Sequence, residues 1–112
     1  MLPKSRKIRG RKIFGVIYKS GQKTFSRFVA LFFVPNGGPS KFACVVSLKV
    51  SKKAVLRNKL RRRAYSLIRK NLFNIKDGYA TILVFKSGAA ELSYPQLSKN
   101  ILDLFKKSGL IT

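Results

Sequence analysis

The chain has 112 residues, of which 46% are hydrophobic, and this length and composition predict one compact domain, 1–112. Its net charge of +22 opposes compaction, so a polyanion is the expected partner, with nucleic acid as the first candidate and an anionic membrane as the second. The absence of His and the single Cys exclude a protein zinc site, as well as Ser-His-Asp and Cys-His catalysis.

The N-terminus predicts a basic arm followed by a short helix. Residues 1–9 are basic and lack periodicity, which indicates an extended arm. The apolar positions between Arg11 and Lys19 suit a helix, and Gly21 is a plausible C-terminal stop.

Two strands are expected next. "TFSRFVALFFVP" (24–35) and "KFACVVSLKV" (41–50) are rich in aromatic and β-branched residues, and the flexible "NGGPS" between them predicts a hairpin. A very short extra strand could lie within 21–27. Alternation along the second strand makes Cys44 a small buried apolar residue rather than a reactive thiol.

The C-terminal half predicts helix, strand and helix. The basic segment 52–70 is the most helix-like part of the chain, and "DGYATILVFK" (77–86) is a third long strand. A helix over 93–107 has a strong start signal, because Ser93 can cap it and Gln96 can complete a capping box. Helices on a small sheet give an α+β, or α/β sandwich, fold.

The basic helix separates its residues into two faces. At about 100° per residue, one stripe is apolar and the opposite arc is cationic, carrying one amide and one aromatic side chain, Asn58 and Tyr65. The apolar stripe consists of Leu56, Leu60, Ala64, Leu67 and Ile68. A merely solvated face would mix Glu with Lys, but 52–70 contains no acid. The arc therefore predicts phosphate binding, with Tyr65 available to stack on a base and the Arg63 stem lying along apolar surface.

This segment resembles the signature of the protein subunit of bacterial ribonuclease P. The family has an Ala-Val-x-Arg-Asn core followed by two basic positions, which here are Ala54, Val55, Leu56, Arg57, Asn58, Arg61 and Arg62. "VSLKVSKK" (46–53), "IFGVIYKSG" (13–21) and "ELSYPQLSKNILDLFKKSGL" (91–110) also resemble family segments in the same order. Arg63 and Tyr65 depart from the family pattern, so no family contact is carried over to them.

The resemblance implies a fold and a division of labour. The fold is a central, mostly antiparallel sheet flanked by helices, in the order α-β-β-(β)-α-β-α, with a left-handed strand–helix–strand crossover. A large catalytic RNA would hold the Mg²⁺ ions and the active site, and the protein would bind that RNA and the 5′ leader of precursor tRNA. The resemblance implies a cytoplasmic protein with no membrane association, and no obligate protein partner is predicted.

The resemblance also assigns two sets of residues. The expected contacts with the RNA subunit are Lys52, Lys53, Arg57, Asn58, Lys59, Arg61 and Arg62. The expected leader-binding cleft contains Phe14, Tyr18 and Phe32, with Phe28, Ala30 and Phe32 on one strand face and Phe33 on the other. The alternative is that these aromatic residues belong only to the core.

Two other functions remain open from the sequence. A small basic structural protein bound to ribosomal RNA is compatible with the composition. A self-sufficient nuclease is a weaker alternative, because its only carboxylates would be Asp77, Glu91 and Asp103, which share no spacing.

Overall fold

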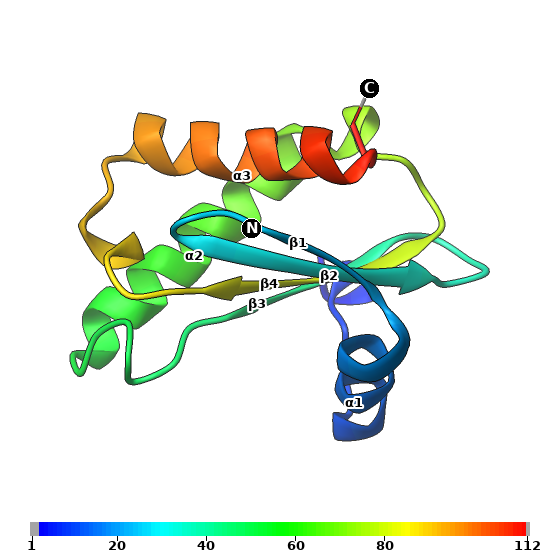
Figure 1. The fold of residues 1–112 in the computed structure, drawn as a ribbon, viewed down its shortest axis with the longest axis horizontal. Coiled ribbons are helices and arrows are strands. Elements are labelled where there is room, and N and C mark those ends of the chain that lie inside the picture. Colours follow the sequence, from blue (N-terminus) through cyan, green and yellow to red (C-terminus); the bar gives the residue numbers. More distant parts are fainter. Residues whose placement is uncertain (1–2, 112) are drawn as a thin grey trace.

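A four-stranded sheet separates α1 from α2 and α3 (Figure 1). The structure, a computed structural model, describes residues 3–111. The helices are α1 (Arg11–Ser20), α2 (Ala54–Lys70) and α3 (Tyr94–Ser108), and the strands are β1 (Gln22–Phe25), β2 (Val29–Pro35), β3 (Lys41–Val45) and β4 (Tyr79–Phe85). The α+β class and the extra short strand are thereby confirmed.

The sheet has the order β1-β2-β4-β3, which differs from the predicted hairpin. β2 pairs antiparallel with β1 and with β4, and β3 pairs parallel with β4. The predicted strand 24–35 is divided by a turn in which the Ser26 N–H donates to the Val29 carbonyl at 2.9 Å. β1 is therefore the hairpin partner of β2, and β4 lies between β2 and β3. The crossover from β3 to β4 passes through α2, and its left-handed sense stays a prediction.

The predicted strand 41–50 ends early. Phe42, Cys44 and Val46 are buried as expected, but Leu48 is 66% exposed. Residues 47–50 close a turn, with the Val50 N–H donating to the Ser47 carbonyl at 3.1 Å. The loop that leads into α2 therefore begins well before the basic segment.

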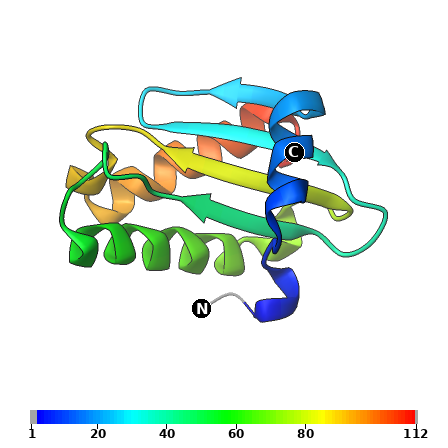
Figure 2. The same ribbon diagram turned by 90° about the horizontal axis from the view of Figure 1, so that it is seen from below.

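The two faces of the sheet are covered unequally. α2 and α3 enclose the larger core on one face, which includes Leu31, Leu83 and Phe105. On the opposite face α1 covers one end only, where Ile17 and Ile82 are fully buried. Figure 2 shows α1 crossing this end of the sheet and α2 running along its β3 edge. The remainder of the α1 face carries partly exposed apolar side chains, which include Phe32, Val45 and Val84.

α3 begins and ends where local signals predict. The Ser93 hydroxyl accepts the N–H of Gln96, while the Gln96 side chain accepts the N–H of Ser93, so the capping box is complete. Gly109 ends the helix with φ 85°, a left-handed conformation that favours glycine.

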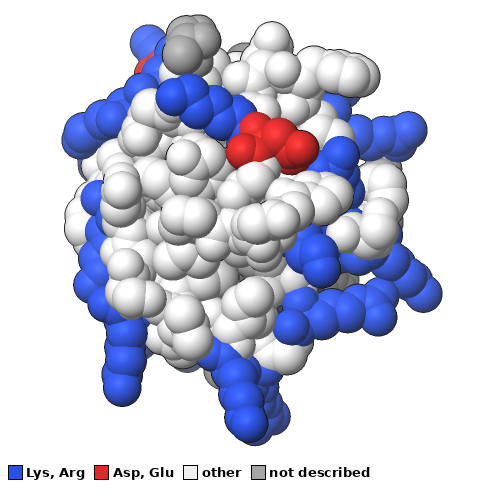
Figure 3. Space-filling view, turned by 90° about the vertical axis from the view of Figure 1, so that its right-hand side faces the viewer, with Lys and Arg blue, Asp and Glu red and all other residues white. Residues whose placement is uncertain are grey.

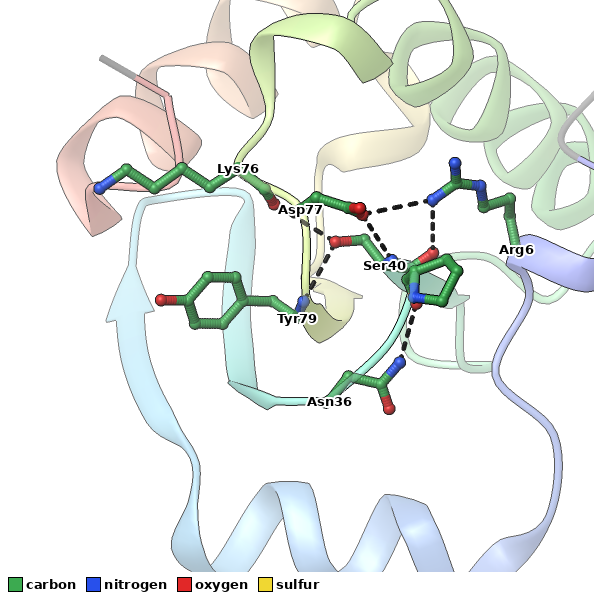
Figure 4. Close-up of polar contacts among 7 residues, drawn as sticks. Arg6, Asn36, Ser40, Lys76, Asp77 and Tyr79 are labelled. Carbon is green, nitrogen blue, oxygen red and sulfur yellow. Dashed lines mark hydrogen bonds and ion pairs between the residues drawn. The ribbon is translucent and has the colours of Figure 1, made fainter.

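The N-terminal segment is docked rather than extended. The Ile8 N–H donates to the Phe42 carbonyl at 2.9 Å, and the Ile8 side chain is buried. Arg6 contacts both the Ser40 carbonyl at 3.2 Å and Asp77 at 3.5 Å, as Figure 4 shows. The predicted extended arm is therefore anchored beside β3 through Arg6, Lys7 and Ile8, and its first two residues lie outside the described part of the chain.

Candidate nucleic-acid interface

The exposed flank of α2 forms a groove with the N-terminal segment. This groove, of about 560 Å³, is lined by Lys7, Val55, Asn58, Arg61, Arg62 and Tyr65. The three polar side chains from α2 occupy positions i, i+3 and i+4, which share one helix face. We call this the arm-side groove. It brings together three of the residues predicted to contact RNA and adds Lys7, which the sequence did not single out.

Hydrogen bonds orient two of the predicted arginines. The Arg61 guanidinium donates to Asn58 Oδ1 at 2.7 Å, so the two side chains are held as a pair. Arg57 donates to the Ser51 carbonyl at 2.9 Å, which fixes the loop to the first turn of α2. One donor group of Arg57 is therefore occupied in stabilising the entry into the helix.

The predicted lysines lie around the start of α2. Lys52 and Lys53 are exposed just before the helix, and Lys53 occupies the N-cap position without a side-chain cap. Lys59 is exposed on the flank that faces α3 rather than in the arm-side groove. The residues predicted to contact the RNA subunit therefore lie on two different flanks of α2.

Tyr65 does not have the exposed position that the sequence predicted. It is 8% exposed, and its hydroxyl accepts the backbone N–H of Cys44 at 3.1 Å. The Lys7 ammonium lies 4.8 Å from the ring centroid. Leu56, predicted as a member of the apolar stripe, is instead 36% exposed in the first turn. The buried face of α2 is rotated toward Tyr65, which forms the floor of the groove rather than a platform for a base.

Cys44 is buried beneath this floor, as predicted. Burial strongly raises the pKa of its thiol, outweighing the charges of Arg61 and Lys7, which lower it. The thiol therefore stays protonated and acts as an apolar core group.

The basic surface has almost no internal compensation. Within residues 3–111 the one ion pair is Arg6 with Asp77. On the side of the molecule in Figure 3, Lys and Arg surround a largely uncharged centre, and acidic atoms occupy a small area. An external polyanion is the natural source of the missing negative charge.

A second candidate surface lies on the open side of the sheet beside α1. Tyr18 and Phe32 are in edge-to-face contact with ring centroids 5.0 Å apart, and Phe14 lies 6.4 Å from Tyr18. All three residues are partly exposed. Partial burial raises the pKa of Tyr18, so its hydroxyl is neutral at physiological pH. The three residues predicted for the leader cleft are thus brought together by α1 and β2.

The row of rings continues onto β1 through a residue that sequence reasoning missed. Phe25 is 50% exposed and lies 6.0 Å from Phe32 in edge-to-face geometry. Lys86 lies over Phe25 at 5.3 Å, and Lys23 over Phe32 at 6.0 Å. The β1–β2 register, in which Lys23 pairs with Phe32, places these side chains on one face. We call Phe14, Tyr18, Phe32 and Phe25 the ring row.

Of the two other aromatic residues placed from the sequence, Phe33 lies where it was predicted and Phe28 does not. Phe33 is buried on the opposite face, 5.7 Å from Tyr79, as expected. Phe28 was expected beside Phe32, but it lies in the turn before β2 and packs against the α2–α3 core. The strand alternation that would have aligned the two does not extend into that turn.

The family model described as Ribonuclease P matches residues 2–109 of the chain. The chain belongs to the ribonuclease P protein family. The ribonuclease P protein component of Synechococcus sp. (strain JA-2-3B'a(2-13)) is 33% identical over 116 residues, which cover 99% of this chain and 87% of that protein. The corresponding protein of Microcystis aeruginosa is 31% identical over 98% of this chain and 96% of its own length.

Solved structures of ribonuclease P proteins share the fold. The protein from Staphylococcus aureus superposes with a TM-score of 0.89 at 22% identity, covering 97% of this chain and 100% of that chain. The protein from Thermotoga maritima gives a TM-score of 0.82 at 26% identity, covering 90% and 96% of the two chains. The mixed sheet and its helices are therefore those of the family.

The chain's own donors do not form a metal cage in the part that the structure describes. Residues 3–111 contain no cluster of three or more His, Cys, Asp or Glu side chains. Asp77 Oδ1 already accepts the Ser40 N–H at 2.8 Å. The same residues include no helix long and apolar enough to cross a bilayer.

Proposed function

We propose that the chain is the protein component of a ribonuclease P ribonucleoprotein, which removes the 5′ leader from precursor tRNA. In this proposal α2 binds the catalytic RNA and the ring row binds the leader. The observation that carries the proposal is the presence of two separate surfaces of different chemistry, one cationic and one aromatic, in a member of this family.

The arm-side groove supports the first contact. Arg61 and Arg62 provide forked donors suited to phosphate, while Asn58 holds Arg61 in place. Lys52, Lys53 and Arg57 at the start of α2 and Lys59 on its other flank add positive charge to the same helix. Each neutralised phosphate should steepen the salt dependence of binding by about 0.7–0.9 units of log K per log salt.

The ring row supports the second contact. An unpaired strand can stack its bases on exposed rings, and each stacked base contributes about 1–3 kcal/mol without preference for sequence. Lys23 and Lys86 lie against the same rings and can contact the phosphates of the strand. Leaders of different sequence could therefore bind in the same way.

Catalysis in this proposal resides in the RNA. Three acidic side chains in the whole chain give no set of ligands for hydrolytic metal ions, so the Mg²⁺ ions would be held by the RNA subunit. The protein supplies positive charge and a shaped surface that orient the precursor.

The test is binding of the cognate ribonuclease P RNA at several salt concentrations by the wild-type chain and by Arg61→Ala. The proposal predicts weaker binding and a flatter salt slope for the variant. An unchanged slope would remove Arg61 from the interface. A ribosomal RNA-binding protein, the second candidate function, would instead prefer ribosomal RNA over the ribonuclease P RNA.

A further inference from the structure

The ring row ends beside a small pocket between β1 and α3. This pocket, of about 200 Å³, is lined by Phe25, Ser26, Asn100, Asp103, Leu104 and Lys107. The Lys107 ammonium donates to the Phe25 carbonyl at 3.2 Å, which ties α3 to β1, an edge strand of the sheet. We call this site the edge pocket. Because Phe25 belongs to both the ring row and the edge pocket, a strand bound along the rings would reach the pocket next.

The edge pocket offers oxygen acceptors that no other group occupies. The Asn100 amide nitrogen donates to the Gln96 carbonyl at 2.8 Å, which leaves Asn100 Oδ1 as a free acceptor. Asp103 is exposed, and neither an ion pair nor a hydrogen bond among the described residues involves its carboxylate. The pocket therefore presents carboxylate and amide oxygens to a ligand that carries N–H donors.

Charged ligands of either sign are disfavoured in the edge pocket. Asp103 is one of three acidic residues in the whole chain, and its carboxylate repels a phosphate placed in the pocket. Lys107 in the lining, and Lys86 at 5.3 Å from the Phe25 ring centroid, repel a metal ion or an ammonium group. A neutral group with several N–H donors meets both conditions, and an unpaired nucleobase is such a group.

Guanine matches the Asp103 carboxylate best among the four bases. Its Watson–Crick edge places the N1–H beside the N–H of the exocyclic amino group, so the two carboxylate oxygens can accept both. Adenine and cytosine set one amino group beside a ring nitrogen that is an acceptor. Uracil flanks its one N–H with two carbonyl groups, which a carboxylate repels.

We propose that the edge pocket binds an unpaired guanine of the precursor leader, with the Asp103 carboxylate accepting from its Watson–Crick edge. This inference rests on the proposed binding of the leader by the ring row. Stacking on rings tolerates any base, so the edge pocket adds one selective position to a leader surface that otherwise accepts different sequences. A bidentate pair discriminates between bases by about 5- to 150-fold. Water competes for the exposed Asp103, so a value near the lower end, about 5- to 10-fold, is expected here.

The experiment measures the affinity of the reconstituted holoenzyme for precursor tRNAs whose all-adenine leaders carry one guanine, moved by one nucleotide at a time. With the wild type, guanine at one leader position should bind about 5- to 10-fold more tightly than adenine at that position. Inosine, which lacks the exocyclic amino group, should reduce this gain.

Three variants assign the preference to the Asp103 carboxylate. Asp103→Asn should lose the preference for guanine, and Asp103→Glu, which keeps a carboxylate, should retain it. The matched control is Glu91→Gln, which removes an exposed acid outside the pocket and should leave the preference unchanged. Loss of a negative charge strengthens binding of every leader alike, so the readout is the ratio of the guanine and adenine affinities.

The outcomes separate this inference from the proposed function. A guanine preference that survives in Asp103→Asn, or a wild type that shows no preference at any leader position, overturns the inference. If the wild type nevertheless binds the precursor more tightly than mature tRNA, leader binding by the ring row is retained. Equal wild-type affinities for precursor and mature tRNA reject the proposed leader binding and this inference together.

Discussion

The hydroxyl of Tyr65 accepts the backbone N–H of Cys44 at 3.1 Å, and this bond joins α2 to β3 at the edge of the sheet. Among the four strands β3 pairs with β4 alone, and the N-terminal segment bridges its other edge at Phe42, so the Cys44 N–H, which points away from β4, has Tyr65 as its partner among the described residues. The same tyrosine forms the floor of the arm-side groove. The stability of the sheet edge and the shape of the arm-side groove therefore depend on one side chain.

Replacing Tyr65 with Phe should lower stability without removing a base-stacking contact. The variant leaves a buried donor unsatisfied, which costs about 1–3 kcal/mol. Urea unfolding measures this loss, and Tyr79→Phe is the control, because the Tyr79 hydroxyl makes no hydrogen bond to residues 3–111. Weaker RNA binding with unchanged stability would show instead that Tyr65 contacts RNA directly.

Phe32→Ala should weaken binding of the leader-bearing precursor by roughly 5- to 150-fold, the equivalent of about 1–3 kcal/mol of stacking. Phe32 is the central ring, in contact with both Tyr18 and Phe25. Affinity for mature tRNA, which lacks the leader, should stay the same. Both affinities are measured with the reconstituted holoenzyme, and equal losses would indicate a folding defect.

Phe25→Ala should shorten the length of leader that the protein senses. Phe25 lies at the β1 end of the ring row, so in the proposed complex it would contact the nucleotide farthest from Phe14. In a series of precursors whose leaders lengthen by one nucleotide at a time, the wild type should gain affinity at one leader length at which the variant gains none. Val16→Ala, an exposed change on α1 outside the row, should keep that step. A step that survives in Phe25→Ala removes this ring from the leader path.

Asp77→Asn should reduce the acid sensitivity of the fold. The Ser40 N–H above all, with a smaller effect of Arg6, holds the pKa of Asp77 below its ordinary value of about 3.9. The unfolded chain therefore takes up this proton at higher pH than the folded chain does. The contribution of Asp77 to stability is full above the unfolded pKa and is lost as pH falls through the folded pKa.

Melting temperatures between about pH 6 and pH 2 test this difference. The melting temperature of the wild type should fall more below about pH 4 than that of Asp77→Asn does. Asp103→Asn, which removes an exposed carboxyl on α3, should follow the wild type. Coincident curves for the wild type and Asp77→Asn would show that the Ser40 contact does not stabilise the fold.

Local signals predicted the parts of the fold that depend on neighbouring residues. The helix expected over 93–107 is observed at Tyr94–Ser108, because the capping box and Gly109 act within a few residues of each end. The strand 77–86 likewise appears as β4. The pairing of β4 between β2 and β3 depends on segments far apart in the sequence, so the NGGPS turn misleadingly favoured a local hairpin.

The candidate site was predictable in its residue types more than in its geometry. Phe14, Tyr18 and Phe32 do meet, but Phe25 was hidden because the break at Ser26 was not recognised. Tyr65 was misplaced because the angular analysis treated α2 as an isolated helix whose buried stripe included Leu56. Contact with β3 sets which face is buried, and that contact cannot be read from one helix.

Reconstitution with the cognate ribonuclease P RNA at low Mg²⁺ tests the central claim most directly. The protein should accelerate release of the 5′ leader from precursor tRNA and lower the Mg²⁺ concentration that the RNA requires, while the protein without RNA should leave the precursor intact. Cleavage by the RNA that is no faster with the protein than without it, at physiological ionic strength, would contradict the account.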